Sequence, residues 1–433
     1  MAQPTYIDPS VLQGENILTI ENDCIRLGVN LGLGGAVTSL CRKGGPNLIN
    51  SYDWGRQVQM SFYSYPTPYL PQGKTVRESW KFLGWNPIQS GDCFGHRSRI
   101  LEHRCTDNEI YVRCIPMHWP LDNVPGECTF ETWYRLNGTR VDVTARLNNA
   151  RPETVWSPAR GQELPAVYTN GEWYKLVSYT GAQPFTGGPV SALCTRENGL
   201  GWPWVSYLST EHWAALVNDE NEGLGVYNGG VYHFIGGFFG EKGTGGPKDV
   251  NTGYISPVSE EILDRNIEYT YQYSLIVGSV EDIRRTAAEL TDRAAENTWR
   301  FAHSRCHFTY RNIADAGWPV GDCLDFSFDP SGALVSPTLF CGAGSLHELV
   351  LDAALEGGEL PCTVRLTLYD DEVRITTREN RPHDTLDVPC TLSCGGGRRL
   401  HTIPLPEVRQ PVIGFELLFR GSGHANVYAA QLR

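Results

Sequence analysis

The sequence lacks long hydrophobic runs, and this absence limits where the protein can reside. No stretch approaches the roughly 18 uncharged apolar residues that a membrane-spanning helix requires. Residues 1–5 contain no basic segment leading into an apolar run, so no signal peptide is predicted. We therefore expect a soluble cytoplasmic protein that does not bind membranes, with prior removal of a signal segment left open.

The cysteine pattern lacks the motifs of metal and redox sites. There are 13 cysteines but no Cys-x-x-Cys pair, and the closest spacing is Cys390 to Cys394. This excludes zinc ribbons and thioredoxin-like motifs and favours reduced, partly buried thiols. Nucleophile-elbow, P-loop, His-Glu-x-x-His and dinucleotide motifs are also absent. We therefore predict no cofactor and no metal.

Positive charge is scarce and scattered. Lys and Arg total 36 against 49 Asp and Glu, which gives a formal charge of −13 without any basic run. Nucleic acids and anionic membranes are poor partners for such a chain. The balance favours a neutral ligand, and an anionic sugar would need a local cluster of arginines.

What the sequence does contain is β-strand pattern. Hydrophobic residues make up 41% and charged residues 20%, as in a globular protein. Alternating runs occur at residues 25–29, 58–63, 140–147 and 269–277, separated by many of the 46 glycines and 27 prolines. This favours a mainly β fold built of antiparallel sandwiches.

One segment has a helical pattern. Ile283, Ala287, Leu290 and Ala294 follow helical spacing after Ser279, a good N-cap residue, which predicts a helix over 280–301. We place a domain boundary at its end. Residues 1–301 would form a catalytic domain, and residues 302–433 a smaller β-sandwich that serves as a carbohydrate-binding or interface module.

The N-terminal part resembles galactose-mutarotase-like domains. The residues that carry the likeness are the Gly-rich strand pair 24–40, the segments 47–50 and 53–56, and the strand 271–277 before the helix. The resemblance covers residues 15 to about 300 and implies a large antiparallel β-supersandwich. The superfamily includes sugar epimerases and sandwich domains of glycoside hydrolases and polysaccharide lyases. The second domain departs from a simple mutarotase, and the epimerase His and Glu motifs have no match here.

Four residues are candidates for acid or base catalysis. Glu163 lies between Gln162 and a Leu-Pro pair, where we expect the entrance of a strand. The other candidates are Asp53, Glu131 and His96. The competing interpretations are an exposed loop glutamate at 163, an Asp–Arg pair that fixes a turn at 53, a solvated strand face at 131 and a structural histidine at 96.

The candidate substrate-binding residues are amides, guanidiniums and aromatic rings. Amides and guanidiniums suit sugar hydroxyls, and aromatic rings can stack on the C–H faces of a sugar. Half of the tryptophans would instead be core residues. The candidates are Trp54, Arg56, Gln57, Gln59, Trp119, Arg160, Gln162, Tyr168, Trp173, Trp202 and Trp204.

We interpret the chain as a glycoside hydrolase that acts on an oligo- or polysaccharide with two carboxylates. The first alternative is a polysaccharide lyase, in which Arg56, Gln57, Tyr168 and His96 would neutralise and deprotonate an acidic sugar. A mutarotase or epimerase and a non-catalytic glycan-binding protein remain open. The oligomeric state, the sugar and the linkage are open as well.

Overall fold

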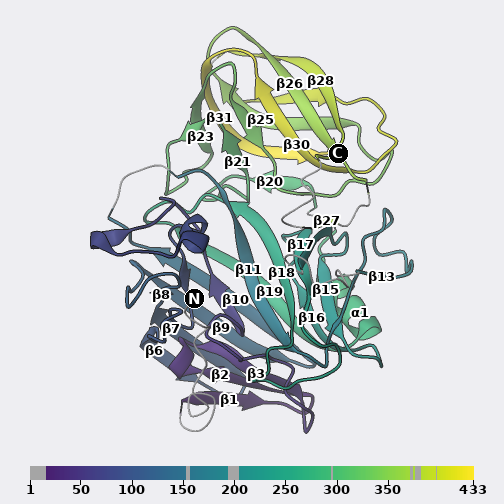
Figure 1. Cartoon of the computed structure of the whole chain (residues 1–433). Coiled ribbons are helices and arrows are strands. Elements are labelled where there is room, and N and C mark those ends of the chain that lie inside the picture. The colour runs from purple at the N-terminus through teal and green to yellow at the C-terminus, as the bar shows by residue number, and fades with distance from the viewer. Residues whose placement is uncertain are drawn as a thin grey trace.

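The computed structural model describes residues 16–152, 157–193, 204–293, 296–370, 374–375, 382–395 and 397–433. Strands dominate, and all strand pairs are antiparallel in the described part of the chain. The prediction of a mainly β protein built of antiparallel sheets is confirmed. The strands form two large sheets and two smaller ones, and the smaller ones gather at one end of the molecule (Figure 1).

The first large sheet has eleven strands and carries the site described below. Its order is β1 (Ile17–Glu21), β2 (Ile25–Asn30), β3 (Ala36–Arg42), β4 (Val58–Ser61), β11 (Arg160–Asn170), β18 (Thr252–Glu261), β17 (His233–Phe239), β14 (Trp204–Leu208) and β27 (Arg374–Ile375), with β5 (Pro87–Ile88) beside β4 and β8 (Met117–His118) beside β5.

The second large sheet has nine strands. Its order is β13 (Ser191–Ala192), β12 (Lys175–Ser178), β15 (Trp213–Val217), β16 (Glu222–Tyr227), β19 (Glu268–Ser279), β10 (Arg140–Asn149), β9 (Cys128–Asn137), β7 (Glu109–Ile115) and β6 (Arg99–Cys105). The β9–β10 connection is a tight turn at Asn137-Gly138, where Gly138 has a φ of 59°.

The inner faces of these two sheets share one apolar core. Along β10, Val141, Val143, Ala145 and Leu147 are buried, and they alternate with partly exposed residues. Phe62, which follows β4, meets Phe130 of β9 edge to face at 5.4 Å between ring centroids. Both belong to a single buried cluster with residues from both sheets, so the two sheets form a sandwich.

The C-terminal part forms the two smaller sheets around a second apolar core. One has the order β22 (Ala314–Asp315), β23 (Leu324–Phe328), β31 (Gly423–Leu432), β25 (Glu348–Leu355) and β29 (Arg399–Pro404), with β20 (Thr298–Arg300) beside β31. The other has the order β21 (Thr309–Arg311), β24 (Ala333–Val335), β30 (Val412–Phe419), β26 (Glu359–Leu368) and β28 (Thr385–Ser393).

Several contacts join the two parts of the chain. Strand β27 adds to the edge of the eleven-stranded sheet by pairing with β14. Tyr369 donates a hydrogen bond from its hydroxyl to the carbonyl of Thr180. The buried Arg305 bridges Asp264 and Asp315, with N–O distances of 2.5 and 2.6 Å. The division into two domains at residue 301 stays a prediction.

The predicted helix is present but shorter than expected. Helix α1 spans Val280–Leu290, and Ser279 caps it by accepting the Asp282 N–H, as predicted. The extension to Phe301 is wrong, because residues 298–300 form β20 instead and pair with β31. Trp299 of that strand packs on Phe308 and Phe415 in the second core, so strand pairing and burial outweigh the helical pattern. Ala294 lies outside the described residues.

Neither membrane helices nor disulfides occur in the described ranges. None of the helices there combines the length and the apolarity needed to cross a membrane. The twelve cysteines that the structure describes are all free thiols, half of them buried.

A buried ion pair fixes α1 on the outer face of the nine-stranded sheet. Glu211 is fully buried, and both of its carboxylate oxygens accept hydrogen bonds from Arg284 of α1, at 2.7 and 2.8 Å. The indole N–H of Trp213 and the backbone N–H of Phe185 also donate to this carboxylate. Because an unpaired buried carboxylate is costly, this contact holds the helix in place.

We predict that Arg284→Gln lowers the free energy of unfolding by about 3 kcal/mol, because it leaves the buried Glu211 carboxylate without its cation. The neighbouring Arg285 pairs with Asp282 on the surface, where it is 64% exposed, so Arg285→Gln should cost less than about 1 kcal/mol. Urea unfolding of the two variants measures the difference. Equal costs would show that the Glu211 pair does not hold the helix.

Candidate functional site

A cavity of about 740 Å³ opens on the face of the eleven-stranded sheet that points away from the core. Its walls combine aromatic rings, amides and four charged side chains. The lining includes Asp53, Arg56, Gln59, Ser61, Tyr63, Trp80, Phe82, Asn86, Trp119, Arg160, Gln162, Glu163, Ala166, Tyr168, Trp204, Ile235, Phe239 and Tyr254. Asp53 and Glu163 are the two carboxylates among these described lining residues.

Strand β11 supplies the central residues of the cavity. Its register against β18 and β4 shifts just after Glu163, where Pro165 has no N–H to donate to a ladder. Leu164 and Val167 point into the core, whereas Ala166 and Tyr168 line the cavity with Glu163. Glu163 lies inside this strand and pairs with Ser61 and Val258, so the expectation of a strand entrance is wrong.

Two phenols hold the Glu163 carboxylate. Tyr63 donates its hydroxyl proton to Oε2 at 3.0 Å, and Tyr254 donates to Oε1. Burial raises the pKa of Glu163 above its usual range, and hydrogen bonds from Tyr254 and Tyr63 oppose part of that rise. Among the described neighbours of its carboxylate, all hydrogen-bond donors are neutral. Glu163 therefore keeps its proton to a higher pH than an ordinary glutamate.

Asp53 has a different environment. Arg56 lies 3.3 Å away, measured from Nε to Oδ2, and the N–H of Gly55 donates to Oδ1 at 3.0 Å. Burial raises the pKa of Asp53, while the Arg56 charge and the backbone N–H groups lower it. A Cβ at Gly55 would lie 3.1 Å from the ring of Trp119, so this glycine allows Trp119 to approach Asp53.

Tyr168 connects the two carboxylates electrostatically. Burial raises the pKa of its phenol strongly, and the charges of Glu163 and Asp53 raise it further. A phenol in this environment stays protonated, so Tyr168 can donate a hydrogen bond but is a poor base. Its ring lies 4.9 Å from that of Tyr254, which in turn lies 5.0 Å from the ring of Trp204.

Arg160 acts as a brace rather than as a free cation. Its guanidinium donates to the carbonyls of Ser64, Phe82 and Leu83 at 3.2, 2.8 and 3.0 Å. Arg56 is likewise engaged, by Asp53 and by the carbonyl of Val250 at 2.8 Å. Both guanidiniums that line the cavity therefore already have partners within the protein.

The structure does not bring the other two catalytic candidates to this cavity. Glu131 lies on β9 of the nine-stranded sheet, where it accepts hydrogen bonds from Tyr111 at 2.8 Å and Asn148 at 3.0 Å. His96 lies in a loop, with Nδ1 at 2.9 Å from the buried Asp92 carboxylate. Of the four candidates, Asp53 and Glu163 share the cavity.

The substrate-binding candidates divide in the same way. Those that line the cavity are Arg56, Gln59, Trp119, Arg160, Gln162, Tyr168 and Trp204. Trp54 and Trp173 are buried in apolar clusters and are not part of the lining, although the cavity residue Trp119 packs against the Trp54 cluster. The buried Gln57 donates to the carbonyl of Asp53. Trp202 lies outside the described residues.

Several cavity residues escaped the sequence interpretation. Tyr63 ends the alternating run 58–63, two residues after Ser61, so strand alternation could have placed it on the same face as Ser61. No sequence pattern would have predicted that Tyr254, Trp80 and Phe82 line the cavity. Trp80 and Phe82 belong to a 3-10 helix, η4 (Glu78–Leu83), in a long connection whose path depends on Arg160.

One group of side chains elsewhere has the composition of a metal site. Asp92, His96 and Asp122 offer ligand atoms that all lie within 4.8 Å of one another. The Asp92 oxygens, however, already accept the N–H groups of Phe94, His96 and Asn123. The buried Asp92 carboxylate therefore already has hydrogen-bond donors, and its role in the structure is to hold the loop in shape.

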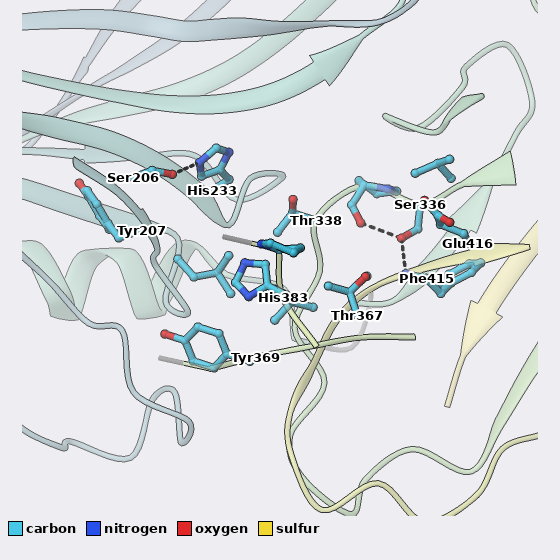
Figure 2. Close-up of a pocket in the computed structure, with 16 residues that line it drawn as sticks. Ser206, Tyr207, His233, Ser336, Thr338, Thr367, Tyr369, His383, Phe415 and Glu416 are labelled. Carbon is cyan, nitrogen blue, oxygen red and sulfur yellow. Dashed lines mark hydrogen bonds between the residues drawn. The ribbon is translucent and has the colours of Figure 1, made fainter. Parts of the chain in front are cut away.

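A second pocket, of about 410 Å³, lies where the C-terminal sheets meet the eleven-stranded sheet (Figure 2). His233 of β17 and His383 both line it, and the Ser206 hydroxyl lies 2.6 Å from Nε2 of His233. Burial lowers the pKa of His233 to about 4, with a smaller contribution from the charge of His383. His383 pairs with Asp370 at 3.3 Å.

Comparisons with known proteins add structural likenesses. No protein family matches the sequence, and no curated protein matches it. A galactose mutarotase related enzyme from Lactobacillus acidophilus is 14% identical, with a TM-score of 0.36 over 61% of this chain and 97% of that one. A galactose mutarotase-like protein from Lactobacillus casei is 12% identical, with a TM-score of 0.38 over 60% of this chain and 99% of that one. An alpha-galactosidase from Lactobacillus brevis is 8% identical, with a TM-score of 0.34 over 61% of this chain and 39% of that one.

The structural neighbours are thus galactose mutarotase-like proteins and a sugar-active enzyme. At these identities and TM-scores the likenesses carry no argument about chemistry. The chemical argument rests on the cavity itself.

We predict that His233 makes the fold sensitive to acid. Its folded-state pKa of about 4 lies below the ordinary 6.5, so the unfolded chain binds the extra proton first. The stabilisation is complete above pH 6.5 and is lost as the pH falls towards 4. The free energy of unfolding of the parent protein should fall between pH 7 and pH 4.5. In His233→Gln this fall should be smaller by about 2 kcal/mol.

Urea unfolding at both pH values measures this effect. His303 is 77% exposed, so His303→Gln is the matched control and should keep the pH dependence of the parent. An unchanged pH dependence in His233→Gln would contradict the prediction.

Proposed function

We propose that this protein is a carbohydrate-active enzyme that hydrolyses a glycosidic bond in the cavity on the eleven-stranded sheet. The observation that carries the proposal is the environment of Glu163, a partly exposed carboxylate at the cavity wall whose partners are neutral phenols. The surrounding amides and aromatic rings suit the hydroxyl groups and C–H faces of a sugar.

The two carboxylates have environments that suit different roles. Glu163 has a raised pKa and no cationic partner, so it is the general acid that protonates the leaving oxygen. Burial raises the pKa of Asp53 as well, but Asp53 has the guanidinium of Arg56 beside it, which favours the ionised form, whereas Glu163 has neutral partners. Asp53 is then the carboxylate that attacks the sugar or activates water.

A polysaccharide lyase has less support. A lyase needs a cation or amide to neutralise the sugar carboxylate and a base to remove a proton. Arg56 and Arg160 are both engaged within the protein, and the raised pKa of Tyr168 makes its phenol a poor base. These contacts favour a neutral sugar.

A second candidate is mutarotation or epimerisation of a free sugar. The observation in its favour is that Tyr63, Tyr168 and Tyr254 surround a single carboxylate, so that Glu163 could exchange a proton with a sugar ring while the phenols donate hydrogen bonds. Polarimetry on freshly dissolved aldoses tests it, and a mass gain of one water in the product identifies hydrolysis instead.

We predict that Glu163→Gln lowers turnover by at least about 100-fold, because a positioned acid contributes roughly 10²–10⁴-fold. The amide is nearly isosteric, so the fold and sugar binding should persist. Kinetics on a substrate found in a glycan screen, read by product mass, measure the loss. Glu260→Gln is the control, because Glu260 lies on the adjacent β18 but outside the cavity lining.

A fully active Glu163→Gln variant would remove the assignment of Glu163 as the acid. Weaker binding with unchanged turnover at saturation would make Glu163 a substrate ligand instead.

We predict that Tyr254→Phe moves the alkaline limb of the pH profile of kcat to higher pH. The Tyr254 hydrogen bond lowers the pKa of Glu163, so its loss lets the acid stay protonated in more alkaline solution. Tyr269→Phe is the control, because Tyr269 donates a similar hydrogen bond at 3.0 Å to Glu261, outside the cavity. A shift towards lower pH in Tyr254→Phe would contradict the role of Glu163 as the acid.

A further inference from the structure

Two exposed phenylalanines line the same cavity from separate elements. Phe82 belongs to η4 and is 62% exposed, and Phe239 ends β17 and is 48% exposed. By contrast, Trp204 and Tyr254 in the same lining are almost fully buried. The rings of Phe82 and Phe239 therefore meet the solvent while the cavity interior stays enclosed, which marks them as part of its mouth.

The backbone that carries Phe82 is fixed. Arg160 donates to the carbonyls of Phe82 and Leu83, the last two residues of η4. The next residue, Gly84, has a φ of 64°, and a Cβ there would lie 2.5 Å from the carbonyl oxygen of Ser64 and 2.9 Å from Nη1 of Arg160. Glycine at this position thus gives room for the brace. A braced exposed ring is a better stacking surface than one on a loose loop, because less ordering is needed on binding.

Two tryptophans extend the aromatic surface of the lining. Trp80 and Trp119 lie 6.0 Å apart between ring centroids, and both line the cavity. The two guanidiniums in the lining are occupied by Asp53 and by backbone carbonyls. Neither guanidinium needs a ligand to satisfy its hydrogen bonds, and the rings and amides of the lining favour an occupant that presents apolar faces together with hydroxyl groups.

We propose that the substrate is a neutral oligosaccharide or polysaccharide whose chain extends out of the cavity and stacks on Phe82 and Phe239. This inference rests on the proposed function and adds two residues that determine the preference for chain length. A single sugar bound at Glu163 would leave both rings uncovered, whereas a longer chain would cover them.

Isothermal titration calorimetry on the Glu163→Gln protein tests the inference without turnover. The probes are glucose, galactose, mannose and xylose, each with its linear homotrisaccharide and homohexasaccharide. We expect at least one hexasaccharide to bind ten times more tightly than its monosaccharide. Phe82→Ala and Phe239→Ala in that background should each weaken hexasaccharide binding about two- to tenfold, the equivalent of one aromatic contact, and leave monosaccharide binding unchanged.

Phe94→Ala is the matched control, because Phe94 is 42% exposed but lies outside the cavity lining. Equal affinities for mono- and hexasaccharides, no effect of either Phe→Ala change, or no binding of any probe would each overturn the inference. Length-dependent binding without any cleavage by the parent protein would contradict the hydrolase proposal and support the inference on chain length. Cleavage without length-dependent binding would support the hydrolase proposal and contradict the inference on chain length.

Discussion

The burial of the inner faces of the two large sheets against each other determines which side chains remain for the cavity. On β11, Leu164 and Val167 enter the shared core, so Glu163, Ala166 and Tyr168 must lie on the opposite face. The shift in register near Pro165 keeps all three on that face despite their spacing. The positions of these three cavity residues thus follow from the packing of β11 on the core.

Arginines that are engaged within the protein fix the segments around this frame. Arg284 holds α1 through Glu211, Arg305 joins Asp264 to Asp315, and Arg160 holds the end of η4 by its carbonyls. An unpaired buried charge costs several kcal/mol, so each contact strongly favours one arrangement. In the cavity lining, Arg56 pairs with Asp53, and Arg160 is hydrogen-bonded to backbone carbonyls. The hydrogen-bond donors to Glu163 are neutral phenols, so no cation offsets the rise in its pKa that burial causes.

Strand patterns and chemical composition anticipated much of this arrangement. The alternating runs predicted the sandwich, and Asp53, Arg56, Trp119, Glu163, Tyr168 and Trp204 do share one cavity. Errors arose where distant contacts override local pattern. Helix α1 ends at Leu290, and residues 298–300 pair with β31 instead of continuing the predicted helix. Glu131 matches Glu163 in residue type but lies on the other sheet, and only the packing of the sheets separates the two.

The sequence by itself determined the alternating strands, the cap of α1 and the types of side chain available to a site, because alternation, capping and composition are local properties. The tertiary structure alone decided that Tyr63 and Tyr254 hold Glu163, that Arg160 holds the end of η4, and that Phe82 and Phe239 line one cavity. Glu163 and its two phenols come from three neighbouring stretches of a sheet that are about 100 residues apart in the chain. Contacts over such separations are set by sheet order and core burial, which no local pattern encodes.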